Sequence, residues 1–211
     1  MDRGMTVFPY RWKDEKAQEF ARQQEAILAV GRLEAKASSQ SNLPTLSPSA
    51  LLRGNFGQRI VLPSPNGSTI TTRLDEAKTH VIAGCLRNAS AVAEFLQARL
   101  ELGESVAIIA AGERWPSDGS LRPAIEDYLG VGVILSELTA RGFRELMTPE
   151  ASCADDLYVM RSKNLSATIR GCASALELQA MGFEDDVDVA LERNSSSTVP
   201  VLDNGAIIAI R

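Results

Sequence analysis

The chain has 211 residues, 45% of them hydrophobic, and its 27 acidic and 22 basic side chains give a net charge of −5. This length and apolar fraction suit a soluble protein with one substantial hydrophobic core. The negative charge argues against a nucleic-acid partner, and the absence of a long apolar run argues against a membrane-spanning segment.

The N-terminal residues, the three cysteines and the single histidine argue against further classes of protein and of active site. No signal-peptide core follows Met1, so the expected location is cytoplasmic. Cys85, Cys153 and Cys172 lack the spacing of metal ligands or of a cysteine phosphatase loop, and we expect them to be reduced. The single histidine, His80, makes a Ser-His-Asp triad or a two-histidine metal site improbable.

The first third of the chain predicts strands that alternate with an amphipathic helix. Ser38–Ser49 should be a loop, because Pro44 and Pro48 block regular structure. The predicted strands are Thr6–Pro9, Ile27–Val30 and Arg59–Leu62, and the predicted helix is Lys13–Gln23, with Ala17, Phe20 and Ala21 on its buried face.

The segment after the third strand is the most informative part of the sequence. Pro63–Thr69 is a tight polar turn, and its Asn66-Gly67 pair permits positive φ, so that successive N–H groups could form an anion-sized concavity. Ser68 and Thr69 could cap a helix that begins near Ile70. The alternative is an ordinary β-turn.

The middle of the chain continues the alternation. Strands are predicted at Thr79–Ala83 and Ser105–Ala111. Between them, Asn88 can cap a helix that runs to about Leu100. The apolar residues of this helix should face the sheet; they are Ala89, Val92, Ala93 and Leu96. A loop at Trp115–Ser120 leads to a long helix with Pro123 in its first turn.

The last quarter predicts short helices followed by a hairpin. Pro149–Gly182 has a mostly helical pattern, and Asp186-Val187-Asp188 reads as a solvated helix start. Val199–Leu202 and Ala206–Ile210 flank an Asn-Gly turn, which is the strongest hairpin signal in the chain. The predicted fold is α/β: a three-layer α/β/α arrangement with a mixed sheet and a C-terminal β-hairpin, in a single domain over residues 1–211.

Acidic residues mark the start of the long helix. Glu126 and Asp127 lie in its first turn, where the helix dipole alone would favour them. The functional alternative is that they bind Mg²⁺ at the carboxyl edge of the sheet, where Glu113 should also emerge. Gly130 and Gly132 follow in the same helix, at a cost in helix propensity that indicates close approach to a neighbouring element.

Several motifs, in order, carry a resemblance to a known family. They are the turn Ser64-Pro65-Asn66-Gly67-Ser68, the helix start Asn88-Ala-Ser-Ala-Val-Ala, the strand ending in Ala111-Gly112 and the helix start Glu126-Asp127-x-x-Gly130. Together they resemble the 2-phosphosulfolactate phosphatase family, whose named member is the coenzyme M biosynthetic phosphatase. The resemblance extends from about Val7 to the C-terminus.

The resemblance implies Mg²⁺-dependent hydrolysis of a small anionic phosphomonoester, 2-phosphosulfolactate, to 3-sulfolactate and phosphate. It implies Mg²⁺ ligands at Glu126 and Asp127 and catalytic roles for Glu113 and Asp127. The implied substrate-binding residues are Ser64, Asn66, Gly67, Ser68, Thr69 and Arg87. Arg73, Arg114 and Arg122 are further cations that could hold a doubly anionic substrate.

The sequence also departs from the family pattern. The usual first strand and loop, V-x-D-V-L-R-A-T-T, is expected to be missing, and a missing central strand would expose a sheet edge and suggest a homodimer. Gly31-Arg32-Leu33 stands where Gly-Glu-Arg is usual. The competing interpretation is therefore a catalytically altered or inactive relative that acts as a small-anion-binding or interaction protein.

Overall fold

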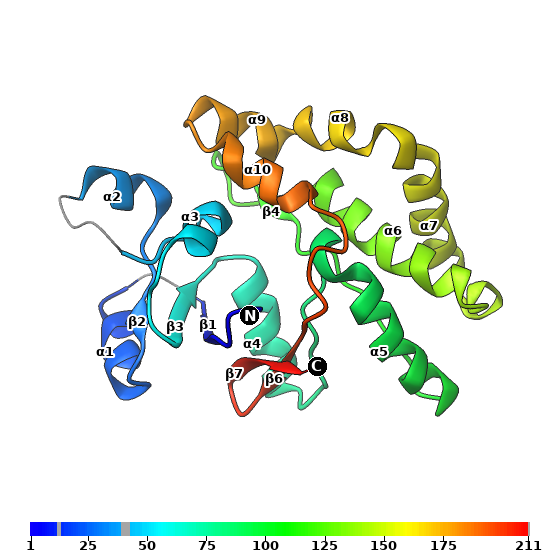
Figure 1. The fold of residues 1–211 in the computed structure, drawn as a ribbon, viewed down its shortest axis with the longest axis horizontal. Coiled ribbons are helices and arrows are strands. Elements are labelled where there is room, and N and C mark those ends of the chain that lie inside the picture. The colour runs from blue at the N-terminus through cyan, green and yellow to red at the C-terminus, as the bar shows by residue number, and fades with distance from the viewer. Residues whose placement is uncertain (12–13, 39–42, 211) are drawn as a thin grey trace. The chain divides into compact units, whose positions relative to one another are not determined.

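The computed structural model describes residues 1–11, 14–38 and 43–210. The chain forms two compact units (Figure 1). The first consists of Met1–Ala83 together with Pro200–Arg211, and the second consists of Gly84–Val199.

A mixed sheet forms the centre of the first unit. Among the described residues it has five strands, in the order β2-β3-β1-β7-β6. The parallel strands are β1 (Thr6–Tyr10), β2 (Ile27–Leu28) and β3 (Arg59–Pro63). The hairpin strands are β6 (Val199–Asp203) and β7 (Ala206–Ile210), and β7 runs antiparallel to β1. The predictions of a mixed sheet and a C-terminal hairpin are confirmed.

Strand β1 lies in the middle of this sheet. It pairs with β3 from Thr6↔Arg59 to Tyr10↔Pro63, and on its other side Val7 pairs with Ile207. Because a strand from the N-terminal segment stands between β3 and β7, the sheet does not show the gap expected from a missing central strand.

Side chains on the two faces of the sheet belong to two hydrophobic clusters. One contains Phe8 and Val61 and packs against Ala21 and Phe20 of α1 (Glu15–Gln23). The other contains Ile60 and Phe56, with Leu51 of α3 (Pro48–Arg53) beside it. Since consecutive strand residues point to opposite faces, Val61 and Ile60 direct α1 and α3 to opposite sides of the sheet.

The start of α3 corrects one prediction. Pro48 does not block regular structure; it is the first residue of α3, where a missing N–H costs nothing. Ser47 caps this helix by accepting the N–H of Ala50 at 3.2 Å. A short helix, α2 (Arg32–Ala37), precedes it. The predicted start of α1 at Lys13 and residues 39–42 of the predicted loop lie outside the described residues.

Helix α4 (Gly67–Glu76) follows β3 directly. The predicted strand after it is wrong in extent, because only Ile82 forms a β-bridge, with Val201. The N–H of Ala83 donates to Pro200 O, and the N–H of Leu202 donates to Val81 O, each at 2.9 Å. This segment is therefore held to β6 by scattered bonds rather than by a regular ladder.

The second unit is mainly helical. Its helices are α5 (Ala89–Glu101), α6 (Ile125–Ala140), α7 (Pro149–Arg161), α8 (Leu165–Arg170), α9 (Ala173–Ala180) and α10 (Glu184–Leu191), with short 3₁₀ turns at Leu86–Asn88, Arg144–Leu146 and Ser162–Asn164. Helix α6 packs against both α5 and α7 (Figure 1). The predicted apolar stripe of α5 is buried, but it belongs to this helical packing and not, as predicted, to a sheet face.

Gly132 explains how closely α6 and α7 approach. A Cβ at this position would lie 2.5 Å from Ala154 O and 2.7 Å from Tyr158 Cβ. A Cβ added at Gly130 would have no described atom from outside the nearby backbone of its own helix within 4 Å. The prediction of a close approach is confirmed for Gly132 and is wrong for Gly130.

The predicted strand at Ser105–Ala111 is wrong. These residues have no regular structure, and Ile109 is 54% exposed. A two-stranded ribbon follows instead, made of β4 (Glu113–Arg114) and β5 (Leu121–Arg122), with the predicted loop at its tip. Helix α6 then begins at Ile125, so the prediction that Pro123 lies in its first turn is wrong by two residues.

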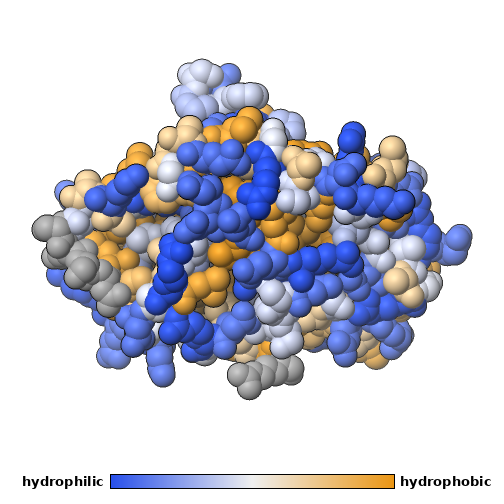
Figure 2. Space-filling view, turned by 45° about the horizontal axis from the view of Figure 1, so that its top comes forward, coloured by the Kyte–Doolittle hydropathy of each residue, from blue (hydrophilic) through white to orange (hydrophobic). Residues whose placement is uncertain are grey.

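Acidic residues at the start of α10 are less solvated than predicted. Asp186 is only 2% exposed, whereas Asp188 forms an exposed ion pair with Arg170 at 2.5 Å. All three cysteines are free, and only Cys172 is buried. Hydrophobic and hydrophilic side chains are interspersed on the face shown in Figure 2. Among the described helices, none is long and apolar enough to cross a membrane.

Candidate functional site

The first group of predicted site residues lies where β3 passes into α4. Strands β1 and β3 are parallel, so both end at the same edge of the sheet. The N–H of Ser64 donates to Tyr10 O at 3.0 Å, which holds the turn against the end of β1. The carboxyl edge of an open α/β sheet is where such folds bind ligands, and the N-terminus of α4 lies there.

The conformation of this turn corrects the predicted anion concavity. Asn66 has φ −101° and ψ −78°, and Gly67 is not among the glycines with positive φ. Helix α4 already begins at Gly67, three residues before the predicted start. Ser68 is thus inside the helix, where its hydroxyl donates to Leu62 O at 3.0 Å instead of capping. Any anion here would meet a helix N-terminus rather than a left-handed turn.

The second group consists of the predicted carboxylates. Glu113 lies in β4, and Glu126 and Asp127 lie in the first turn of α6. Asp127 Oδ2 accepts the N–H of Gly112 at 2.8 Å. Gly112 has φ +69°, a conformation that favours glycine. A glycine at this position therefore allows the backbone conformation in which its N–H meets Asp127.

The three carboxylates interact electrostatically. Burial raises the pKa of Asp127, the N–H of Gly112 opposes that rise, and the negative charges of Glu126 and then Glu113 add to it. Burial also raises the pKa of the Cys172 thiol, and the Glu126 carboxylate adds to this effect. Cys172 is therefore held as a neutral thiol, which does not suit a nucleophile.

The carboxylates supply donors that suit Mg²⁺. The described residues contain no group of three or more His, Cys, Asp or Glu side chains gathered as a metal-binding set. Mg²⁺, however, is usually held by one or two carboxylates, with water and substrate phosphate completing its octahedron. Glu126 and Asp127 fit this limited requirement by donor type, and a cation would relieve the like-charge repulsion that acts on Asp127.

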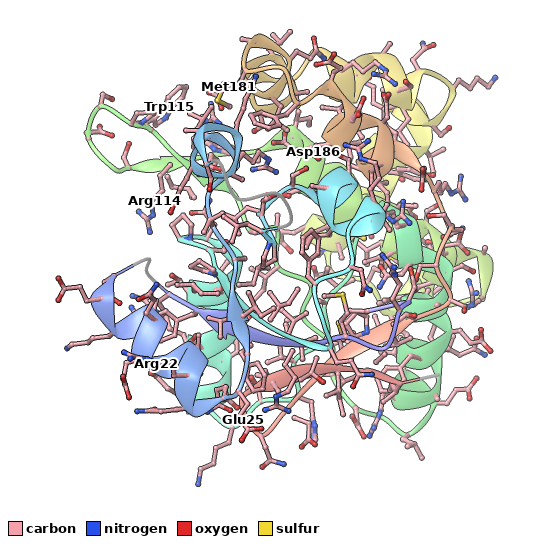
Figure 3. All side chains as sticks on the ribbon, turned by 60° about the vertical axis from the view of Figure 1, so that its left-hand side comes forward. Arg22, Glu25, Arg114, Trp115, Met181 and Asp186 are labelled. Atoms are coloured by element: carbon pink, nitrogen blue, oxygen red, sulfur yellow. The ribbon has the colours of Figure 1, made fainter. Side chains whose placement is uncertain are left out.

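The predicted cationic side chains are largely committed to partners. Arg122 is 5% exposed, and it binds both carboxylate oxygens of Glu177, at 2.5 and 3.0 Å. Its guanidinium also lies 5.4 Å from the ring centre of Trp115. Figure 3 shows Arg114 and Trp115 beside one another on the ribbon, and Arg114 donates to Gly119 O at 2.7 Å.

Arg87, the predicted substrate-binding arginine, is also paired. It forms an ion pair with Glu192 and donates to Val189 O at 3.1 Å. Arg73 is an exposed residue of α4. The turn at Ser64–Thr69 belongs to the first compact unit, and Arg87, Glu113, Glu126 and Asp127 belong to the second. That the two groups form one site stays a prediction.

Arg11 is not among the site residues predicted from the sequence. This residue follows β1 at the edge where α4 begins, and its Nε is buried without a hydrogen-bond partner in the part of the chain that the structure describes. The available signal was its position one residue after a predicted strand, but a lone arginine there is usually a surface residue.

The chain is an α/β protein, with a mixed sheet in its first compact unit and mainly helices in its second. The family model for 2-phosphosulpholactate phosphatase matches residues 4–205. The chain therefore belongs to the 2-phosphosulfolactate phosphatase family. Because the match begins at residue 4 and includes β1, it does not support the prediction that the family's N-terminal segment is missing.

Individual relatives carry the same family name. The chain is 34% identical to the 2-phosphosulfolactate phosphatase of Methanothermobacter thermautotrophicus over 72% of its own length and 59% of the relative. It is 30% identical to a probable 2-phosphosulfolactate phosphatase of Deinococcus radiodurans, over 69% of the chain and 57% of that relative. It is 27% identical to a probable 2-phosphosulfolactate phosphatase of Thermotoga maritima, over 89% of the chain and 75% of that relative. The chain thus spans less than two thirds of the first two relatives. These names describe phosphoric monoester hydrolases.

Proposed function

We propose that the protein hydrolyses a small phosphomonoester with the help of Mg²⁺, and that 2-phosphosulfolactate is its substrate, giving 3-sulfolactate and phosphate. Family membership over residues 4–205 supports the reaction class. The structural observation that carries the proposal is the half-buried Asp127, held by Gly112 N–H beside two further carboxylates.

The substrate phosphate would bind at the N-terminus of α4. Gly67, Ser68 and Thr69 form its first turn, and first-turn N–H groups at the positive end of a helix dipole attract anions. Ser64 and Asn66 precede this turn and would complete the binding loop. Arg87 would take part only by exchanging Glu192 for the substrate, because its side chain is paired with that carboxylate.

The three carboxylates would bind the metal ion and accept a proton. Glu126 and Asp127 would hold Mg²⁺, which when bound supplies stabilisation of phosphoryl oxygen charge. Glu113 would accept a proton from the attacking water. Burial raises the pKa of Asp127 and its two acidic neighbours add to this rise, and a cation bound there would oppose the repulsion between these carboxylates.

A second candidate function is a non-catalytic relative that binds a small anion. The observation in its favour is that Arg122 and Arg87 are already neutralised within the protein, which leaves fewer cations for a doubly charged substrate. A homodimer, a cytoplasmic location and a place in coenzyme M biosynthesis stay predictions. The homodimer was expected from an exposed sheet edge, and that reason no longer applies because β1 lies in the middle of the sheet. Sedimentation velocity would measure the oligomeric state directly.

Steady-state phosphate release from Asp127→Ala and Glu126→Ala tests the proposal. We expect each to lower kcat at least about tenfold and to raise the Mg²⁺ concentration needed for half activity. Glu94→Ala, which removes an exposed carboxylate of α5, is the matched control and should change neither quantity. Full Mg²⁺-dependent activity in both site variants would refute the assigned roles.

A further inference from the structure

Arg122 is a buried arginine next to two of the candidate carboxylates. In the β4–β5 ribbon it is the cross-strand partner of Glu113, and directly opposed residues of antiparallel strands have their side chains on the same face. Arg122 also precedes Glu126 by four residues, and Pro123 stands in the short connection to α6. Because proline fixes its own φ, this connection has little freedom. The position of Arg122 therefore affects both Glu113 and the first turn of α6.

Helix α9 holds the Arg122 side chain in one orientation. The guanidinium donates to both carboxylate oxygens of Glu177, at 2.5 and 3.0 Å, and its Nη2 also donates to Ser174 Oγ at 3.4 Å. The ring of Trp115, on the ribbon, lies 5.4 Å from the guanidinium carbon. A carboxylate that binds two nitrogens of a guanidinium fixes the plane of that group. The Arg122 side chain is therefore held by contacts with both the ribbon and α9.

The start of α9 also approaches Glu126. Cys172 is the N-cap residue of α9, and it is 7% exposed. Burial raises the pKa of its thiol, and the neighbouring Glu126 carboxylate adds to the rise, so the two side chains lie close to one another. One helix thus contacts Arg122 through Ser174 and Glu177 and approaches Glu126 through Cys172.

The charge of Arg122 acts on the same carboxylates. Hydrogen bonding to Glu177 raises the pKa of the guanidinium, burial opposes this rise, and the negative charges of Glu177, Glu113 and Glu126 add to it. The guanidinium therefore interacts electrostatically with two carboxylates of the candidate site as well as with Glu177. A fixed cation at this place offsets the repulsion between those carboxylates and favours their ionised forms.

We propose that Arg122, held in place by Glu177, is a positioning residue that fixes the orientation of the three candidate carboxylates for Mg²⁺. These carboxylates lie in β4 and in the first turn of α6, and Arg122 stands between those two segments. All of these residues belong to the second compact unit. The inference rests on the proposed function for the identity of the metal ion. Arg122 acts through the carboxylates and not on the substrate.

Binding of Mg²⁺ to the full chain tests this role without any substrate. We expect isothermal titration with Mg²⁺ to show that Arg122→Lys weakens binding about tenfold, because lysine keeps the charge but loses the two-point contact with Glu177. Glu177→Gln should weaken binding by a smaller factor. The double variant should bind Mg²⁺ like Arg122→Lys alone, since Glu177 acts through Arg122.

Arg144→Lys is the matched control. Arg144 lies in the 3₁₀ turn after α6, and it pairs with the buried Asp155 at 2.5 Å and with Asp156 at 2.8 Å. Like Arg122, it is an arginine of the second unit that binds carboxylate oxygens, but its partners are not candidate site residues. We expect Arg144→Lys to lower the midpoint of urea unfolding as Arg122→Lys does, and to bind Mg²⁺ like the parent.

Four results would overturn the inference: no Mg²⁺ binding by the parent chain, unchanged affinity in Arg122→Lys, an equal loss in Arg144→Lys, or additive losses in the double variant. Circular dichroism checks each variant, and if Arg122→Lys does not fold, Glu177→Gln decides.

Phosphate release measured on the same samples separates this inference from the proposed function. In an active enzyme, Arg122→Lys should lower kcat about tenfold and leave the KM for the ester within about twofold of the parent value. Arg122-dependent Mg²⁺ binding by a chain that hydrolyses no ester upholds the positioning role and excludes the enzyme. Mg²⁺-dependent turnover that Arg122→Lys leaves unchanged, in kcat and in the Mg²⁺ concentration needed for half activity, does the reverse.

Discussion

Gly130 and Gly132 in α6 differ in what an added methyl group would meet. Gly132→Ala would place its Cβ 2.5 Å from a backbone oxygen of α7, whereas Gly130→Ala would meet no described atom within 4 Å apart from the nearby backbone of its own helix. We expect Gly132→Ala to lower the free energy of unfolding by about 1–3 kcal/mol through overpacking. Gly130→Ala should raise it by up to about 1 kcal/mol through helix propensity. Urea denaturation of both variants measures the difference, and similar values for the two would contradict the close approach of α6 and α7.

Single residues of the candidate site were predictable only in part. The position of Asp127 in a first helical turn follows from local sequence, because carboxylates are typical of a first turn. Its contact with the N–H of Gly112 joins residues 15 apart and depends on the path of the chain between them. The Asn66-Gly67 prediction failed because α4 begins at Gly67, and helical geometry replaces the expected positive φ.

At the level of elements, the buried Arg122 ties the β4–β5 ribbon to α9. Its side chain is 7% exposed, while that of its partner Glu177 is 53% exposed. Glu177→Ala would leave a buried cation without its carboxylate, and we expect a loss of about 1–3 kcal/mol in the free energy of unfolding. Glu104→Ala breaks the exposed pair with Arg99 and should cost no more than about 0.5 kcal/mol. Equal costs in chemical denaturation would contradict a structural role for Arg122.

Helix α6 also carries a pH-dependent contact. Burial alone would raise the pKa of Glu137, but hydrogen bonds from Arg141, Arg193 and Asn194 outweigh it and lower the pKa below 4.5. A carboxylate with a lowered pKa in the folded state stabilises the fold above the pKa of the unfolded chain, and this stabilisation is lost as pH falls through the folded value.

Glu137→Gln should therefore cost about 1–3 kcal/mol in the free energy of unfolding at pH 7, and the difference from the parent should shrink as pH falls below about 4.5. Urea denaturation between pH 7 and 3 measures this trend. Glu94→Gln, on the exposed side of α5, should follow the parent at every pH. A Glu137→Gln difference that stays constant with pH would refute the role of the ionised carboxylate.

The strands show which elements could be predicted. Thr6–Tyr10, Arg59–Pro63 and the hairpin are apolar runs bounded by turn residues, and each has a partner in the sheet. Ser105–Ala111 has the same kind of composition but forms no strand pair with any described residue. Strand formation depends on a neighbouring edge as well as on the residue types, and no local pattern reveals whether that edge is available.

At the scale of the whole molecule, the prediction of a single domain is open to a direct test. Two compact units share one chain, and the second is inserted between Ala83 and Pro200 of the first. If residues 1–211 behave as one cooperative domain, differential scanning calorimetry should show a single transition with equal calorimetric and van't Hoff enthalpies. Two resolved transitions would contradict the single-domain prediction.

Mg²⁺-dependent hydrolysis of a phosphomonoester is the activity that we propose for this protein. The most direct measurement is phosphate release from 2-phosphosulfolactate and a small panel of other phosphomonoesters, with Mg²⁺ and with EDTA. We expect turnover that EDTA abolishes and that Mg²⁺ restores, with 2-phosphosulfolactate preferred. No phosphate release from any ester by well-folded protein would contradict it and favour a relative that binds a small anion without hydrolysing it.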